Sequence, residues 1–290
     1  MPGSRKTHYR TVWLSDIHLG TKFCRVERLV QFLKAVRCDC LYLVGDIIDV
    51  WSMRRKWHWP KDHTEVVRRI LKRDLKGTRI IFVPGNHDEL FRAYHGLQFG
   101  GVEIRNEVIH TTADGRKALV VHGDVFDAIV RHHRLITMVG DWLYDVLLAV
   151  NVHFNTLRRW MGFGHWSLSN YVKQRVKKVI SFISSFEEAL ARYARQKQVS
   201  VVVCGHIHHP ELRDVDGIQY ANCGDWVENC SAVVEHHDGR LEMLRFGPEG
   251  PMPAVLEDDE PAPTEDPHAD LIEPMIVSLA VSPAAAGSPS

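Results

Sequence analysis

The sequence lacks an apolar run long enough to cross a membrane. A spanning helix needs about 20 consecutive apolar residues, and the best candidate among the 290 residues, segment 135–150, is interrupted by Asp141 and Asp145. Residues 1–10 are polar and basic and do not contain the apolar segment of a secretory signal. The six cysteines form no C-x-x-C pair. We therefore expect a cytoplasmic protein whose thiols are reduced.

Basic residues are absent after Arg245. Residues 248–290 contain nine acidic residues and nine of the 13 prolines, and because this composition cannot bury a core we expect a disordered acidic tail. Residues 1–247 contain 36 basic and 27 acidic residues, so the neutral total hides a net charge of +9 on this part. We expect residues 1–247 to fold as one domain, and its basic character favours phosphate-bearing partners.

Five short apolar runs are each followed by a cluster of polar residues. They are rich in Val, Ile, Leu, Tyr and Phe without alternation, which is typical of strands buried on both faces. Helical patterns over residues 25–36 and 63–75 separate the first three runs, so we expect βαβ units. The five runs are residues 10–14, 40–44, 79–83, 118–121 and 199–204.

Two further segments complete the predicted α/β fold. Residues 212–246 contain short alternating runs and two Asp-Gly turn signals, and we expect them to form antiparallel strands that complete a second sheet. The two sheets would pack face to face with helices outside. Residues 125–198 have apolar residues at helical spacing, with 11 Lys or Arg against five Asp or Glu. This pattern predicts a basic and apolar helical cap inserted into the domain.

The polar clusters offer oxygen and imidazole ligands at the predicted strand ends. Because ligands of open α/β sheets bind outside the carboxyl ends of strands, side chains distant in sequence should converge there. The set contains no thiolate and suits Mn, Fe or Zn better than Mg alone, which prefers oxygen ligands. Seven side chains are too many for one tetrahedral ion. The candidate metal ligands are Asp16, His18, Asp46, Asn86, His122, His206 and His208.

Two divalent ions that share one carboxylate would use all seven side chains. We infer that Asp46 is the shared ligand and that the ions are Mn²⁺, with Fe or Zn as alternatives. Two ions about 3.5–4 Å apart can bind a bridging hydroxide and clamp a phosphoryl group for in-line attack. One site would be completed by Asp16, His18 and His208, and the other by Asn86, His122 and His206.

The five polar clusters read D-x-H, G-D-x-x-D, G-N-H-D, H-G-D and G-H-x-H, in that order. With these motifs the chain resembles the calcineurin-like metallophosphoesterase superfamily over residues 9–246. The resemblance implies a four-layer α/β/β/α sandwich, a dinuclear metal centre and the hydrolysis of phosphoester bonds. It also implies the division of ligands inferred above.

Within that superfamily the chain looks most like the group that contains the UDP-2,3-diacylglucosamine diphosphatases of lipid A biosynthesis. The shared features are the single-domain length and the insertion between H-G-D and G-H-x-H, which that group uses to hold acyl chains. That group has Arg after Gly-Asn, where this chain has His87. In the wider superfamily a His at this position assists the reacting phosphate and can protonate an alkoxide leaving group. We expect His87 to be catalytic and Asp88 to orient its ring.

Several other residues near the motifs have two possible roles. Asp49 and Asp124 could each orient a histidine or cap the following segment. Basic and aromatic residues could contact a substrate phosphate, an acyl chain or an anionic membrane surface, or they could be solvated charges and packing residues. These candidate substrate-binding residues are Arg54, Arg55, Trp57, Trp142 and Trp166.

These features favour a phosphohydrolase for a lipid-linked phosphate or pyrophosphate such as UDP-2,3-diacylglucosamine. We expect it in the cytoplasm, peripherally on the inner face of the membrane. The alternative is a general phosphomonoesterase, phosphodiesterase or nuclease of the same superfamily. Because a nuclease would not need an apolar cap, nucleic acid is the less favoured partner. A binding scaffold with a degenerate site is the non-enzymatic alternative, and the oligomeric state is left open.

Overall fold

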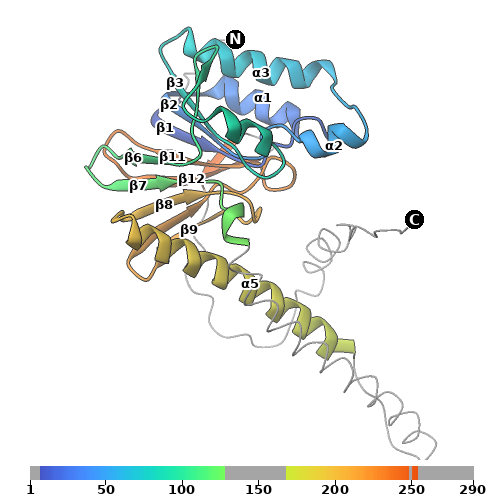
Figure 1. The fold of residues 1–290 in the computed structure, drawn as a ribbon, viewed down its shortest axis with the longest axis vertical. Helices are drawn as coiled ribbons and strands as arrows, with labels where there is room; N and C mark the ends of the chain where they lie inside the picture. The colour runs from blue at the N-terminus through green and yellow to red at the C-terminus, as the bar shows by residue number, and fades with distance from the viewer. Residues whose placement is uncertain (1–6, 128–167, 248–249, 254–290) are drawn as a thin grey trace, which may run out of the picture. The chain divides into compact units, whose positions relative to one another are not determined.

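The computed structural model describes residues 7–127, 168–247 and 250–253, which form two β-sheets with helices on their outer faces (Figure 1). The predicted α/β class and the pair of sheets are confirmed. Trp142, Trp166 and residues 128–167 of the predicted cap lie outside the described residues, as does the predicted tail apart from residues 250–253. Within the described ranges, no helix is long and apolar enough to cross a bilayer.

Eight strands form the first sheet. They are β1 (Thr7–Leu14), β2 (Val36–Val44), β3 (Arg79–Val83), β4 (Gln98–Phe99), β5 (Val102–Ile104), β11 (Ser231–Glu235), β12 (Leu241–Gly247) and β13 (Gly250–Pro253). Their order across the sheet is β13-β12-β11-β1-β2-β3-β5-β4. Strands β1, β2, β3 and β5 run parallel, so their carboxyl ends meet at one edge.

Helices connect the parallel strands across the outer face of this sheet (Figure 1). Helix α1 (Val26–Ala35) joins β1 to β2, and α2 (Val50–Arg55) and α3 (Lys61–Asp74) join β2 to β3. Helices α1 and α3 agree within two residues with the helices predicted over 25–36 and 63–75. Both present an apolar side to the sheet, through Leu29 and Phe32 of α1 and Val66 of α3.

Five strands form the second sheet. They are β6 (Val108–Thr111), β7 (Lys117–Val120), β8 (Val201–Cys204), β9 (Glu211–Val215) and β10 (Ile218–Asn222), in the order β6-β7-β8-β10-β9. Helix α5 (Leu168–Gln196) covers the outer face, where Phe186, Leu190 and Ala194 are fully buried. All of α5 lies in the segment predicted as a cap, and its C-terminal part forms the outer layer of the sandwich.

The prediction that residues 212–246 all complete the second sheet is wrong. Strands β9 and β10 do so, but β11 and β12 belong to the first sheet, where β11 pairs antiparallel with β1. All five residues of β11 are buried, so its side chains would suit a place in either sheet. Its place in the first sheet is determined by contacts between residues that are more than 200 positions apart in sequence, among them Thr11 and Glu235.

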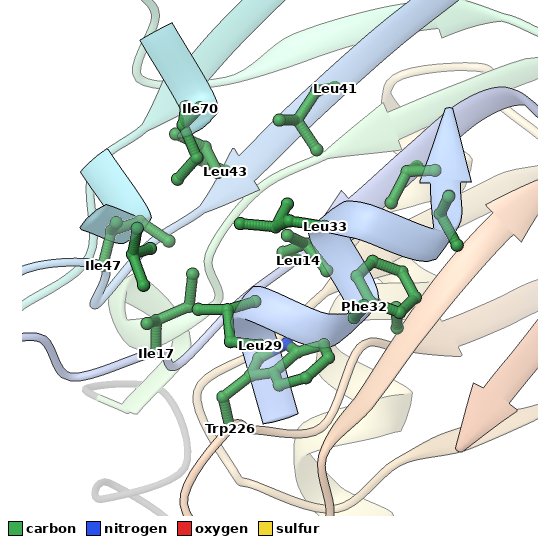
Figure 2. Close-up of a cluster of buried hydrophobic side chains, with 14 of the residues drawn as sticks. Leu14, Ile17, Leu29, Phe32, Leu33, Leu41, Leu43, Ile47, Ile70 and Trp226 are labelled. Atoms are coloured by element: carbon green, nitrogen blue, oxygen red, sulfur yellow. The ribbon is translucent and has the colours of Figure 1, made fainter. Parts of the chain in front are cut away.

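Hydrophobic clusters hold the layers together. The largest lies between the first sheet and helices α1 and α3, where Trp226 packs against Phe32 with ring centroids 5.1 Å apart (Figure 2). Another joins the two sheets and contains Trp13 stacked on Tyr42 at 5.8 Å. Both sheets are therefore fixed relative to each other by a largely hydrophobic interface, which keeps their strand ends aligned.

Glu235 is a fully buried carboxylate at the same interface. Its oxygens accept hydrogen bonds from Arg10 Nη1 (2.5 Å), Thr11 Oγ1 (2.6 Å), His110 Nε2 (2.9 Å) and the Ala113 backbone (2.7 Å). Burial alone would raise the pKa of Glu235, but these bonds hold it at about 2. The carboxylate therefore stabilises the fold fully above its ordinary pKa of 4.5 and loses this contribution as the pH falls towards 2.

We expect Glu235→Gln to remove this pH dependence. The contribution at neutral pH should be on the order of 2–3 kcal/mol, and the wild-type protein should lose it between about pH 5 and pH 2.5. Urea unfolding of both proteins across that range measures the difference. Equal slopes of stability against pH in the two proteins would show that the carboxylate does not act in this way.

Candidate metal centre

The predicted ligands lie just beyond the carboxyl ends of strands from both sheets. Asp16 and His18 follow β1, Asp46 follows β2, and Asn86 follows β3 in the first sheet. His122 follows β7, and His206 and His208 follow β8 in the second sheet. Because the hydrophobic packing of the two sheets against each other aligns these ends, residues nearly 200 positions apart meet at one edge of the sandwich.

The backbone at this edge is strained. Five candidate ligands adopt left-handed conformations, with φ values of 50° at Asp16, 53° at His18, 55° at Asp46, 74° at His206 and 54° at His208. Residues other than glycine seldom adopt such angles, and each costs on the order of 1 kcal/mol or more. The surrounding hydrogen bonds hold them, for example Asp16 N to Gly45 O (3.0 Å) and His18 N to Asp46 O (2.9 Å).

Two glycines of the motifs are required by close approach. A Cβ atom on Gly45 would lie 2.1 Å from His122 Nδ1, and one on Gly85 would lie 2.3 Å from Asp46 Oδ1. Neither neighbour can move without displacing a candidate ligand. The Gly in G-D and in G-N therefore makes room for the side chains of other motifs.

Asp16, His18 and His208 form one group whose ligand atoms all lie within 4.8 Å of one another. His208 Nε2 is 3.2 Å from Asp16 Oδ1 and 3.3 Å from His18 Nε2. The other oxygen of Asp16 accepts hydrogen bonds from Ser15 Oγ (2.5 Å) and from the His206 backbone (2.9 Å). These bonds fix the carboxylate so that Oδ1 faces the two imidazoles.

Asp46, His122 and His206 form a second group, also within 4.8 Å. His122 Nδ1 lies 2.9 Å from the carbonyl oxygen of Val44, which can only accept, so Nδ1 carries the proton. Nε2 is thereby directed at Asp46, 3.4 Å from Oδ2. Such an anchored imidazole is the usual state of a metal-ligating histidine.

The electrostatics of both groups favour a cation. Burial alone would lower the pKa of both His122 and His208, but the carboxylates of Asp46 and Asp16 raise it, to about 10 for His122 and about 9 for His208. The amide oxygen of Asn86 is a second indication of a metal ion. Asn86 Oδ1 is buried and has no hydrogen-bond partner in the described part of the chain, a costly state for an amide oxygen and a suitable one for a metal ligand.

Asp49 joins the metal ligands to His87. Its Oδ2 lies 3.2 Å from His18 Nδ1 and 3.1 Å from His87 Nδ1, while Oδ1 accepts from Ser52 N (2.7 Å) at the start of α2. Burial would raise the pKa of Asp49, but the hydrogen bond with His18 and the neighbouring imidazole of His87 lower it well below its usual range. Asp49 therefore both orients histidines and caps a helix, the two roles that the sequence left open.

Asp88 does not orient the ring of His87, contrary to expectation. Its fully buried carboxylate accepts from the backbone of Gly85 (2.6 Å) and Ile47 (2.8 Å), and so ties the loops after β3 and β2 together. Its pKa is raised to about 6 by burial and by the charge of Asp46. Adjacency in sequence was misleading, because Asp49 supplies the carboxylate at His87 Nδ1.

The candidate substrate residues are less closely joined to this centre. Arg54, Arg55 and Trp57 are exposed, and within the described ranges they make no hydrogen bond or ion pair with the candidate ligands. Trp51, which was not among the predicted site residues, lies against His87 with ring centroids 4.8 Å apart. Its position in the sequence, two residues after Asp49, could have indicated that it lies near the candidate ligands.

Two further acidic residues lie near the centre: Asp124, for which the sequence left two roles open, and Asp127, which was not among the predicted residues. Asp124 accepts from Arg92 Nη2 at 2.7 Å through both oxygens, and so links the loop after β7 to the 3-10 helix η1 (Glu89–Tyr94). Asp127 Oδ1 lies 2.9 Å from His206 Nε2. Asp127 comes soon after the H-G-D motif, and this spacing alone does not identify a residue that contacts a metal ligand.

A turn over residues 225–229 holds two of the candidate ligands. The fully buried Asp225 accepts from the backbone of Val227 (2.7 Å) and Glu228 (2.5 Å) and from the side chain of Asn229. Asn229 Nδ2 also donates to the carbonyl oxygen of His208 (3.0 Å), and Trp226 N donates to that of Asp16 (3.0 Å). The turn thus fixes both loops of the first group.

The family model described as calcineurin-like phosphoesterase matches residues 9–210. The chain therefore belongs to the calcineurin-like phosphoesterase family and is a hydrolase acting on phosphoester bonds. The family implies divalent metal ions, in agreement with the groups of ligands described above.

Curated relatives are similar over most of their length. The UDP-2,3-diacylglucosamine hydrolase of Pectobacterium carotovorum is 25% identical over 255 residues, 81% of this chain and 98% of that one. The protein of the same name from Vibrio cholerae is 22% identical over 242 residues, 77% of this chain and 93% of that one.

Solved structures are more distant. A single mutant of Vps29 from Entamoeba histolytica aligns with a TM-score of 0.42 at 14% identity, covering 83% of this chain and 95% of that chain. The phosphoesterase Yfce from E. coli aligns with a TM-score of 0.36 at 14% identity, covering 80% and 95%. The family assignment rests on the family model and the motifs.

We expect Asn229→Ala to weaken metal binding at the group of Asp16, His18 and His208. Loss of a residue that positions ligands typically costs about 10–100-fold in metal affinity. Metal content after dialysis against graded chelator measures the loss, with Asn106→Ala, an exposed asparagine, as the matched control. If Asn229→Ala retained metal as firmly as the control, the turn would have no positioning role.

Proposed function

We propose that this chain is a dinuclear metal-dependent phosphohydrolase with Asp46 shared between two divalent ions. Asp16, His18 and His208 would hold one ion, and Asn86, His122 and His206 the other. The observation that carries the proposal is the convergence of two ligand groups, each within 4.8 Å, at one edge of the sandwich. All seven expected ligands are present, which argues against a scaffold that has lost its site.

Asp46 lies in the second ligand group and interacts electrostatically with Asp16 and His18 of the first, which supports the proposed shared role. Its Oδ1 accepts from the backbone of His87 (2.8 Å), and its Oδ2 faces His122 Nε2 (3.4 Å) and His87 Nε2 (3.9 Å). Burial would raise the pKa of Asp46, but the neighbouring His122 lowers it, so the carboxylate is ionised. Divalent ions bound here would polarise a phosphoryl oxygen and acidify a water molecule.

His87 is proposed to hold a proton for the leaving group. Burial alone would lower the pKa of His87, but the neighbouring carboxylates of Asp49 and Asp46 raise it. Because Asp49 meets Nδ1, the other nitrogen, Nε2, is directed towards Asp46 and the candidate ligands. An alkoxide leaving group needs a proton there, whereas a phosphate leaving group does not.

The proposed substrate is a lipid-linked phosphate or pyrophosphate such as UDP-2,3-diacylglucosamine, with Mn²⁺ as the metal. The support comes from the names of the curated relatives and from the net charge of +9 on residues 1–247. Arg54, Arg55 and Trp57 follow Asp49 closely in α2 and the next loop and would contact the substrate or an anionic membrane surface, with the protein peripheral to it. Trp142 and Trp166 remain predictions.

A second candidate is a phosphomonoesterase or phosphodiesterase with an alkoxide leaving group. The observation that favours it is His87 itself, whose Nδ1 lies 3.1 Å from Asp49 Oδ2, at a position where the diphosphatase group has Arg. The two candidates differ in the leaving group, so one residue and a small set of substrates can separate them.

We expect His87→Ala to retain both metals and to lose about 10²-fold or more in kcat for substrates with alkyl leaving groups. Aryl leaving groups and phosphate leaving groups should lose much less, because they depart without a proton. Steady-state kinetics with metal analysis measures both effects.

Asp46→Asn should instead lose metal and turnover together, while the exposed Asp216→Asn is the matched control with neither loss. An equal loss for all leaving groups in His87→Ala would contradict the proton-donor role.

We expect acylated UDP-glucosamine to be hydrolysed in preference to its deacylated analogue. Burial of acyl chains should raise kcat/KM by at least about tenfold. Parallel assays with Mn²⁺, a simple phosphomonoester and a cyclic nucleotide test the proposal. Equal rates on the acylated and deacylated compounds would remove the case for a lipid substrate and leave the general phosphoesterase.

A further inference from the structure

We propose that His8, Asp39 and His237 form a separate binding site for a divalent transition-metal ion. The three exposed side chains come from β1, β2 and the turn between β11 and β12, and their ligand atoms all lie within 4.8 Å of one another. His8 Nε2 is 2.8 Å from Asp39 Oδ1. The rings of His8 and His237 meet edge to face, with centroids 4.9 Å apart at 66°.

The backbone that carries these residues is fixed by sheet pairing. Strand β1 lies between β2 and β11, with His8 opposite Arg37 in one register and Thr11 opposite Glu235 in the other. The turn that carries His237 is closed by hydrogen bonds from His236 N to Arg240 O (2.9 Å) and from Gly239 N to His236 O (3.0 Å). The backbone therefore holds the three donors close together, with their ligand atoms within 4.8 Å of one another.

A plain surface hydrogen bond is the simpler explanation of two of these residues. An exposed pair such as His8 and Asp39 contributes about 0–1 kcal/mol and needs no ligand. That explanation does not account for His237, whose imidazole lies against that of His8. The neighbouring charges are paired among themselves, since Glu242 lies 2.6 Å from His236 Nε2 and 3.3 Å from Arg240 Nη1.

Two imidazoles and one carboxylate select the class of ion. Nitrogen ligands suit Zn²⁺, Co²⁺, Ni²⁺ and Cu²⁺, whereas Mg²⁺ and Ca²⁺ prefer oxygen. Three protein ligands leave further positions to water, and because the side chains are exposed the ion should exchange readily. Such an ion would join β1 and β2 to the turn between β11 and β12 and stabilise the folded chain by mass action.

This site is distinct from the candidate metal centre. His8 lies near the beginning of β1, and Asp16 follows the end of that strand, so the length of β1 separates the two groups. An ion at His8 therefore contacts none of the seven candidate ligands. The proposal consequently does not depend on the proposed function.

The test is equilibrium dialysis of the metal-stripped full-length protein against Zn²⁺, with bound metal counted by mass spectrometry. The double variant His8→Ala with His237→Ala should bind one Zn²⁺ fewer than wild type, and Asp39→Asn should bind the ion more weakly. The Tm increase caused by Zn²⁺ should be smaller in the double variant. His95→Ala, which removes another exposed histidine, is the matched control and should bind as many ions as wild type.

Activity with Mn²⁺ should be unchanged in the double variant, which also verifies that the variant folds. An equal number of bound Zn²⁺ ions in the double variant and in wild type would overturn the proposal. So would an equal increase in Tm on adding Zn²⁺. Failure of the phosphohydrolase proposal would appear instead as an absence of Mn²⁺-dependent turnover in every protein, with the difference in Zn²⁺ binding intact.

Discussion

The structure depends on keeping buried carboxylates next to compensating positive charge. Asp16 is fully buried and Asp46 nearly so, and both carboxylates face imidazoles. Taking such charges out of water is expensive unless opposite charge is supplied nearby. The carboxylates also raise the pKa of His122 and of His208, because a protonated imidazole supplies the positive charge that the buried carboxylates need.

The rest of the site can be understood as the means of holding these charges together. The hydrophobic interface between the sheets aligns strand ends that belong to different parts of the chain. Left-handed residues then turn the chain sharply enough to aim several ligands inward, and glycines at 45 and 85 make the space. Asp88 and Asp225, both fully buried, use their carboxylates to tie loops through backbone amides. Strain at the ligands is thus offset by hydrogen bonds one layer further out.

Much of this arrangement could be predicted from sequence because it follows from local patterns. Apolar runs gave the buried strands, and the polar residues after each run had to meet at one edge of a parallel sheet. Contacts between distant segments could not be predicted in the same way. Nothing in the β11 sequence chooses its sheet, and Asp49 and Asp88 look equally suited to orient His87 until the loops are placed. The roles of Trp226 and Asn229 depend on backbone atoms of Asp16 and His208, which leave no trace in composition or spacing.

The antiparallel pairing of β1 with β11 has a consequence for the order of folding. Strand β1 is made first, yet one of its two neighbours comes from residues 231–235, so a loop of more than 200 residues must close before the sheet is complete. Contacts of such long range are formed late, because the entropy of closing the loop must be offset first. During synthesis the parallel half of the sheet can assemble early with an open edge at β1. The metal centre at the strand ends can be complete only after the last part of the domain has left the ribosome. An incomplete chain would therefore be inert towards phosphoesters.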